Sequence, residues 1–211
     1  MYKMAEKMIL LKPFYLLYKM SLELIIGPMF AGKSSALQSI VRRRTAIGWN
    51  VLVIKHGIDN RYLSQDEENN VVVNHDLQRC PALACTKLMD ALLWQSFIDA
   101  RLIVIEEGQF FEDLVEFTIQ AVETHGKHMV VVGLDGDAHR KPFGQILNLI
   151  PLADEVQRIY ALCKMCGDGT PARFTSAISA TVSEATNSGV PNVGSNESYR
   201  PLCRKHFLEC Y

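Results

Sequence analysis

The sequence predicts an α/β protein whose parallel sheet carries a phosphate loop, followed by a small zinc-binding domain. Three observations support this prediction. Short apolar runs alternate with helix-forming segments up to about residue 160, a glycine-rich loop follows the first run, and two pairs of metal-ligating residues lie beyond residue 160. With 211 residues, the chain is long enough for one large core and a small appended unit.

The apolar runs have the length and composition of buried strands. Alternation of such strands with helices is typical of a parallel sheet that binds its ligand at the C-terminal ends of the strands. The strands are expected at residues 21–26, 51–54, 71–73, 102–105 and 129–132. The helices are expected over residues 34–44, 87–100 and 114–124.

The loop after the first run matches the phosphate-loop pattern G-x-x-x-x-G-K-[ST]. Its residues are Gly27, Pro28, Met29, Phe30, Ala31, Gly32, Lys33 and Ser34. Such a loop turns successive backbone N–H groups toward phosphates, its lysine contacts the β- and γ-phosphates, and its hydroxyl reaches Mg²⁺. The helix that follows adds the dipole of its N-terminus. We therefore expect a Rossmann-like or RecA-like domain that binds a nucleoside triphosphate.

Two adjacent acids, Glu106 and Glu107, end the strand expected at residues 102–105. In phosphate-loop enzymes an acid at this place faces the loop and holds Mg²⁺, directly or through water. Neighbouring side chains on an extended chain point in different directions, so the two acids can divide the work. One can hold the metal while the other accepts a proton from an attacking hydroxyl. The alternative is a pair of solvated acids at a strand end.

Three of the six cysteines, together with one histidine, have the spacing of a structural zinc site. Cys163 and Cys166 form one ligand pair, and Cys203 and His206 form the other. The insert between the pairs has little apolar sequence, so zinc would supply much of its stability. Four protein ligands leave no open position, which favours structural over catalytic zinc. Unrelated thiols are the alternative.

The charge balance argues against a polyanionic partner. The formal net charge is -1 and Arg42-Arg43-Arg44 is the only basic run, so we expect neither nucleic acid nor a membrane as a partner. The first 20 residues are interrupted by Lys12 and Pro13 and are too short to span a bilayer. They are expected to be a peripheral extension, with a targeting segment or an interaction arm as the alternatives.

Taken together, the motifs resemble those of the type II thymidine kinases. The resemblance runs from about Leu22 to about Phe207, and the phosphate loop, the acidic pair and the zinc ligands follow one another in the order of that family. Three further segments contribute to it: Gly108-Gln109-Phe110-Phe111, Arg140-Lys141-Pro142-Phe143-Gly144 and Gly194-Ser195-Asn196-Glu197-Ser198-Tyr199.

The resemblance implies transfer of the γ-phosphate of ATP to the 5′-hydroxyl of thymidine, with Mg²⁺ and a structural Zn²⁺, to give thymidine monophosphate and ADP. It also implies a cytoplasmic homotetramer that is inhibited by thymidine triphosphate (dTTP). Three parts are expected: an N-terminal extension over residues 1–20, an ATP-binding α/β domain over 21–160, and a zinc-binding domain over 161–211 whose long lasso loop covers the nucleoside.

The resemblance also assigns roles to single residues. Glu107 matches the general base, and Glu106, where the family usually has Asp, matches the position that holds Mg²⁺ through water. The remaining expected ATP-binding residues are the phosphate loop from Gly27 to Ser34, Asp59, Asn60, Arg61, Gly108 and Gln109. The expected nucleoside-binding residues are Met29, Phe110, Leu134, Ala138, Phe143, Val190, Asn192, Val193, Gly194 and Tyr199.

Two positions depart from the family. Ala138 stands where many relatives have an aromatic side chain that stacks on thymine, and Pro191 has no N–H to offer the base. A niche for the thymine methyl discriminates by only about 1–3 kcal/mol, so deoxyuridine is expected as a second substrate. Another phosphate-loop nucleotide enzyme or an ATPase is the alternative activity. A non-enzymatic zinc-binding module is the third, and it leaves Lys33 and Glu107 unexplained.

Overall fold

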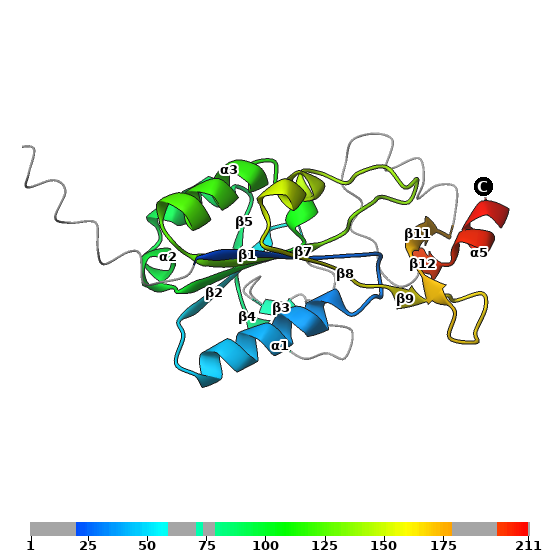
Figure 1. Ribbon diagram of the computed structural model, residues 1–211, viewed down its shortest axis with the longest axis horizontal. Helices are drawn as coiled ribbons and strands as arrows, with labels where there is room; N and C mark the ends of the chain where they lie inside the picture. Colours follow the sequence, from blue (N-terminus) through cyan, green and yellow to red (C-terminus); the bar gives the residue numbers. More distant parts are fainter. Residues whose placement is uncertain (1–19, 59–70, 74–78, 179–197, 211) are drawn as a thin grey trace, which may run out of the picture.

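The computed structural model describes residues 20–58, 71–73, 79–178 and 198–210. At its centre lies a six-stranded sheet with the strand order β5-β2-β6-β7-β1-β8, in which every neighbouring pair is parallel (Figure 1). Its strands are β1 Ser21–Ile26, β2 Val51–His56, β5 Leu83–Cys85, β6 Leu102–Glu106, β7 His128–Gly133 and β8 Glu155–Arg158. The predicted α/β class with a parallel sheet is confirmed.

The strand register brings the functional ends of three strands together. β7 lies between β1 and β6, with Ile26 opposite Gly133 and Ile105 opposite Val131. The residues that follow β1, β7 and β6 therefore leave the sheet side by side. In a parallel sheet this is the edge at which ligands bind.

Helices cover both faces of the sheet (Figure 1). α1, Lys33–Ala46, packs Leu37 and Ile40 against one face, and this core includes Val53, Val104 and Val132 of the strands. The opposite face is covered by the 3₁₀ helix η2 Leu88–Leu93, α2 Gln95–Asp99, α3 Leu114–Ile119 with its π-helical continuation η4 Gln120–Thr124, and the 3₁₀ helix η5 Ile146–Leu152. None of the helices in the described ranges is both long and apolar enough to cross a membrane.

The expected strands are all present, and the helix expected over residues 34–44 is α1. The segment from residue 87 is not one helix, because Trp94 is extended (φ −75°, ψ 137°) and separates η2 from α2. The strand at Val71–Val73 is β3, and it pairs with β4 Arg79–Pro81 in an antiparallel ribbon outside the main sheet.

Beyond the sheet, the chain forms a small unit, residues 161–178 and 198–210, which we call the zinc-binding unit after the role that the sequence predicts for it. It consists of the hairpin β9 Ala161–Leu162 with β10 Pro171–Ala172, the antiparallel pair β11 Phe174–Ala177 with β12 Tyr199–Leu202, and α5 Arg204–Glu209. A separate apolar core that includes Ala172, Leu202 and Phe207 packs beside two of the cysteines. The unit lies beyond the C-terminal ends of the sheet strands (Figure 1).

Candidate functional site

The phosphate loop leaves the end of β1 and enters α1, as expected for an anion-binding turn. Gly27 has φ 155°, and a Cβ at this position would lie 2.3 Å from the carbonyl oxygen of Ile159, so a larger residue does not fit. Gly32 caps α1 in the left-handed conformation. Lys33 is buried, and its Nζ donates to the carbonyl oxygen of Pro28 at 2.8 Å, which places the ammonium inside the loop.

Ser34 and Glu106 face each other across the end of the sheet. The Ser34 hydroxyl donates to Oε1 of Glu106 at 2.5 Å, although 72 residues separate them. Glu106 is the last residue of β6 and is buried. A hydroxyl and a carboxylate side by side at the mouth of a phosphate loop are oxygen donors that suit Mg²⁺. These two residues therefore fit the metal that the sequence predicts.

Glu107 directly follows β6 and occupies the left-handed region, with φ 52° and ψ 48°. This conformation costs a non-glycine residue on the order of 1–2 kcal/mol. The turn directs the Glu107 carboxylate to a different place from that of Glu106, as the sequence suggested. Such strain at the end of a strand is typical of functional sites.

Gln109 fixes the orientation of the Glu107 carboxylate. Its Nε2 donates to Oε2 of Glu107 at 2.7 Å, and its Oε1 accepts from the backbone N–H of Leu134 at 3.0 Å. Gly133 provides the space, because a Cβ there would lie 2.3 Å from Gln109 Oε1. Both ends of this buried amide are thus used, which links the acidic turn to the end of β7.

An apolar cluster forms beside this turn. Its buried members are Met29, Leu134, Ala138 and Tyr199, and the half-buried Phe30, Phe143 and Ala177 pack against them. Phe110 joins them through an edge-to-face contact with Phe143, with 5.6 Å between ring centroids. The nucleoside-binding residues expected from the sequence therefore come together wherever the structure describes them. We call this cluster the base pocket, after the role that the sequence predicts for it.

Sequence reasoning missed Thr175 and His56. Thr175 is buried on β11, and its Oγ1 accepts a hydrogen bond from the backbone N–H of Met29 at 3.0 Å. This bond ties the phosphate loop to the zinc-binding unit, and nothing local in the small, polar sequence around Thr175 indicates it. His56, at the end of β2, places its ring 6.1 Å from that of Phe110 and 4.8 Å from that of Phe111.

The four expected metal ligands lie together at the base of the zinc-binding unit. Their ligand atoms are all within 4.8 Å of one another. Nδ1 of His206 lies 3.5, 3.3 and 3.5 Å from the sulfurs of Cys163, Cys166 and Cys203, and two of the sulfurs are 3.8 Å apart. Tetrahedral zinc with ordinary bond lengths separates S from N by about 3.6 Å and S from S by about 3.8 Å. The cluster therefore fits zinc.

Electrostatics also prepare this cluster for a cation. Burial by itself raises the pKa of the Cys163 thiol. Hydrogen bonds from the backbone N–H groups of Cys203, Cys166 and Met165 outweigh that effect, and together with His206 they lower the pKa to about 6. A thiolate is the form that binds metal. The sulfurs lie near Nδ1 of His206, and the other ring nitrogen, Nε2, lies 3.8 Å from Oε2 of Glu209.

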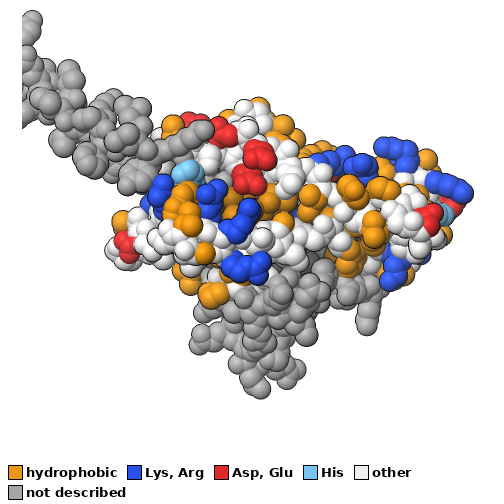
Figure 2. All heavy atoms as spheres, turned by 60° about the horizontal axis from the view of Figure 1, so that its bottom comes forward, with side chains coloured by type: hydrophobic (Ala, Val, Ile, Leu, Met, Phe, Trp, Pro, Cys, Tyr) orange, Lys and Arg blue, Asp and Glu red, His pale blue; other side chains and the backbone are white. Residues whose placement is uncertain are grey.

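Arg44, the last residue of the basic run, packs against an aromatic ring at the end of α1. Arg44 and Arg101 place their guanidinium carbons 4.7 and 4.0 Å from the ring centroid of Trp49. Figure 2 shows Lys and Arg side chains among hydrophobic atoms on this part of the surface. Arg44 lies in the last turn of α1, at the opposite end of the helix from the phosphate loop.

Several expected site residues lie outside the described residues. They are Asp59, Asn60 and Arg61 of the expected phosphate-contacting segment and Val190, Asn192, Val193 and Gly194 of the expected lasso loop, together with Pro191.

Comparison with known proteins gives consistent relatives. The family model described as thymidine kinase matches residues 20–207. The thymidine kinase of vaccinia virus (strain Western Reserve) is 39% identical over 189 residues, which are 89% of this chain and 97% of that protein. The thymidine kinase of Oryza sativa subsp. japonica is 37% identical over 196 residues, 91% of this chain and 68% of that protein. The thymidine kinase of monkeypox virus is 37% identical over 188 residues, 89% of this chain and 97% of that protein.

Proposed function

We propose that this chain, which belongs to the thymidine kinase family, transfers the γ-phosphate of ATP to the 5′-hydroxyl of thymidine and releases thymidine monophosphate and ADP. The observation that carries the proposal is the Glu107 carboxylate, held by Gln109 between the acidic turn and the base pocket. The membership agrees with the resemblance seen in the sequence. It does not favour the alternative of a phosphate-loop ATPase.

In this proposal Glu107 is the general base. Its carboxylate accepts the proton of the thymidine 5′-hydroxyl while the oxygen attacks the γ-phosphorus. Lys33 and the N–H groups of the phosphate loop hold the phosphates and offset the charge that develops on the transferred group. Ser34 and Glu106 would hold Mg²⁺, which supplies further positive charge to the β- and γ-phosphates when bound.

The base pocket gives the proposed specificity. Thymine would lie among Met29, Leu134, Phe143 and Tyr199. Ala138, a buried member of the same cluster, offers no ring to stack on the base. An apolar niche rejects the analogue that lacks a methyl only weakly. Deoxyuridine is therefore a second substrate, whereas deoxycytidine presents a different hydrogen-bonding edge. In the lasso loop, the backbone groups of Val190, Asn192, Val193 and Gly194 would read the hydrogen-bonding edge of the base. Asp59, Asn60 and Arg61 would approach the phosphates of ATP.

Further parts of the proposal rest on the family resemblance. They are a homotetramer, feedback inhibition by dTTP, a cytoplasmic location, and no nucleic-acid or membrane partner. The division into an extension, an ATP-binding domain and a zinc-binding lasso domain, with boundaries near residues 20 and 160, also remains a proposal. Zinc at the Cys₃His cluster is structural in this proposal, because the four side chains complete its coordination.

A phosphotransfer assay tests the function. ADP release is measured with Mg-ATP and thymidine, deoxyuridine or deoxycytidine, for the wild type, Glu107→Gln and the exposed control Glu112→Gln. We expect turnover with thymidine and deoxyuridine, a fall on the order of 10²- to 10⁴-fold in Glu107→Gln, and no loss in the control. Absence of nucleoside-dependent turnover in zinc-loaded wild type would overturn the proposal. Comparable turnover of deoxycytidine would overturn the substrate.

A further inference from the structure

The loop between β7 and η5, residues 134–144, carries three residues of the base pocket, and we call it the nucleoside loop. It is folded back on itself around Asp137. The Asp137 backbone N–H donates to the carbonyl oxygen of Lys141 at 3.0 Å. Oδ1 of Asp137 accepts from the backbone N–H groups of His139 and Lys141, each at 2.8 Å. These hydrogen bonds fix the shape of the loop, so a contact at its tip can position the whole loop.

Arg140 lies at the tip of this loop in a left-handed conformation, with φ 64°. Its guanidinium carbon is 4.8 Å from the ring centroid of Phe207 and 5.8 Å from that of Phe174. The two rings are themselves 5.3 Å apart, and both belong to the zinc-binding unit. Phe207 is buried in the core that contains Cys163 and Cys203. Arg140 thus reaches from the nucleoside loop to the core around the metal ligands.

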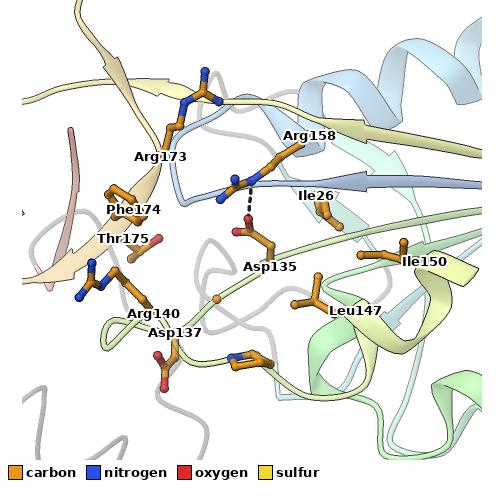
Figure 3. Close-up of a pocket in the computed structure, with 12 residues that line it drawn as sticks. Ile26, Asp135, Asp137, Arg140, Leu147, Ile150, Arg158, Arg173, Phe174 and Thr175 are labelled. Carbon is orange, nitrogen blue, oxygen red and sulfur yellow. Dashed lines mark hydrogen bonds and ion pairs between the residues drawn. The ribbon is translucent and has the colours of Figure 1, made fainter. Parts of the chain in front are cut away.

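The nucleoside loop also meets the zinc-binding unit in the base pocket, where Leu134 and Ala138 lie in one cluster with Tyr199. A cavity separates the start of the loop from the zinc-binding unit near Asp135. This cavity, of about 350 Å³, is lined by Ile26 and Asp135 from the sheet side and by Arg173, Phe174 and Thr175 from the zinc-binding unit. Figure 3 shows Arg140 directed toward Phe174 at one end of this cavity. At the other end Oδ2 of Asp135 accepts from Nε of Arg158 at 2.8 Å, which ties the stem to β8.

We propose that Arg140 is a positioning residue that fastens the tip of the nucleoside loop to the zinc-binding unit and so sets the base pocket. The proposal rests on the proposed function, because it concerns binding of the nucleoside. A stacked guanidinium suits this role, since it is planar, permanently charged and attracted to aromatic faces. Ala138 and Phe143 of the base pocket lie two and three residues from Arg140, so a shift of the loop tip at Arg140 would move both side chains.

ATP binding should not depend on this contact. The phosphate loop has its own tie to the zinc-binding unit, the hydrogen bond from the backbone N–H of Met29 to Thr175 Oγ1. Loss of the Arg140 contact leaves that bond in place. The expected signature is therefore a change in the KM for thymidine that the KM for ATP does not share.

The chain offers a matched control in Arg204. This arginine also stacks on Phe174, with 4.9 Å between its guanidinium carbon and the ring centroid, and both arginines are exposed. It belongs to α5 and therefore does not connect the nucleoside loop to anything. Arg140→Gln and Arg204→Gln remove the same charge from the same aromatic pair, but only the first breaks the connection. Arg140→Gly removes the side chain at a left-handed position that glycine adopts freely, so its backbone is relieved and not strained.

Steady-state kinetics of the zinc-loaded variants test the proposal. We expect Arg140→Gln and Arg140→Gly to raise the KM for thymidine about three- to fivefold, the effect of losing one exposed cation–π contact. The KM for ATP and kcat should stay within about twofold, and Arg140→Lys should recover part of the loss because the cation is kept. Zinc content is measured for each variant. An unchanged KM for thymidine, or an equal rise in Arg204→Gln, would refute the role of Arg140. An inactive wild type would refute the proposed function instead.

Discussion

Gln109 donates a hydrogen bond to the carboxylate of Glu107 at 2.7 Å while the backbone N–H of Leu134 donates to the other end of the same amide. The amide is buried and is locked by both bonds. Glu107 is the proposed base, and Leu134 lines the base pocket. A single side chain therefore links the proposed base directly to a residue of the base pocket.

Replacing Gln109 with Glu should shift the pH dependence of kcat. The substitution keeps the shape and the acceptor for Leu134, but it removes the donor to Glu107 and places a second carboxylate beside it. Like charges at this distance disfavour ionisation of both groups, so the acidic limb of the kcat profile should move to higher pH. At neutral pH we expect kcat to fall about tenfold or more. The test is a measurement of kcat from pH 5.5 to 9 for the wild type and Gln109→Glu. An acidic limb at the same pH in both proteins would contradict the role given to Gln109.

Gly144 should be irreplaceable for a related reason. It has φ 57°, and a Cβ there would lie 2.0 Å from the carbonyl oxygen of Gln109. Gly144→Ala should lower the free energy of unfolding by about 2 kcal/mol or more and reduce kcat, because the backbone that carries Gln109 must move. Gly126→Ala is the matched control: its φ is 64°, with no atom within 4 Å of the added Cβ. Denaturant unfolding of both variants separates the collision from the left-handed backbone cost, and equal losses would show that there is no collision.

The sequence predicted those features that depend on local patterns. The phosphate loop, the acid after β6 and the ligand pairs are short motifs, and the structure places Ser34 beside Glu106 and the four ligands together. Apolar runs likewise predicted β1, β6 and β7. β8 was missed because its four residues are exposed and largely polar, and it is a strand only through pairing with β1.

The contacts that hold the site together could not be predicted in this way. Thr175 is 146 residues from its partner Met29, and Arg140 is 67 residues from Phe207 in the chain. Neither pair has a characteristic spacing, since the fold alone brings the partners together. The prediction of one helix from residue 87 was wrong for a different reason. Nothing in the composition of this segment marks Trp94 as the extended residue that divides it.

Removal of zinc should unfold the zinc-binding unit and abolish activity. The unit has only a small apolar core, and this core includes the ligands Cys163 and Cys203. Zinc bound there would therefore contribute directly to folding. Cys203→Ser, or dialysis against a strong chelator, should lower the melting temperature and the zinc content together. Cys210→Ser is the control, because Cys210 is an exposed free cysteine outside the ligand set. Full activity in zinc-free protein would show that the cluster does not hold the site.

His128 should make the stability of the sheet depend on pH. It lies at the start of β7, where Nδ1 is 2.8 Å from Oγ of Ser21 and the ring is 4.8 Å from that of Trp49. Burial, with Arg101 and Arg44 nearby, lowers its pKa below the ordinary 6.5. The unfolded chain therefore binds the proton more readily than the folded protein does. The contribution of His128 is fully present above pH 6.5 and is lost as the pH falls from there through the lowered pKa.

Glu23 on β1 changes the stability in the opposite direction as the pH falls, because burial and the nearby Glu155 raise its pKa above 4.5. The wild type and His128→Asn both keep Glu23, so its contribution to the pH dependence cancels when their stabilities are compared. We therefore expect the difference in unfolding free energy between the wild type and His128→Asn to shrink as the pH falls from 7.5 to 5. Urea unfolding at several pH values measures this difference, with activity at pH 7.5 as the control because His128 lies at the end of β7 away from the base pocket. A difference that stays constant with pH would mean that His128 titrates normally in the folded protein.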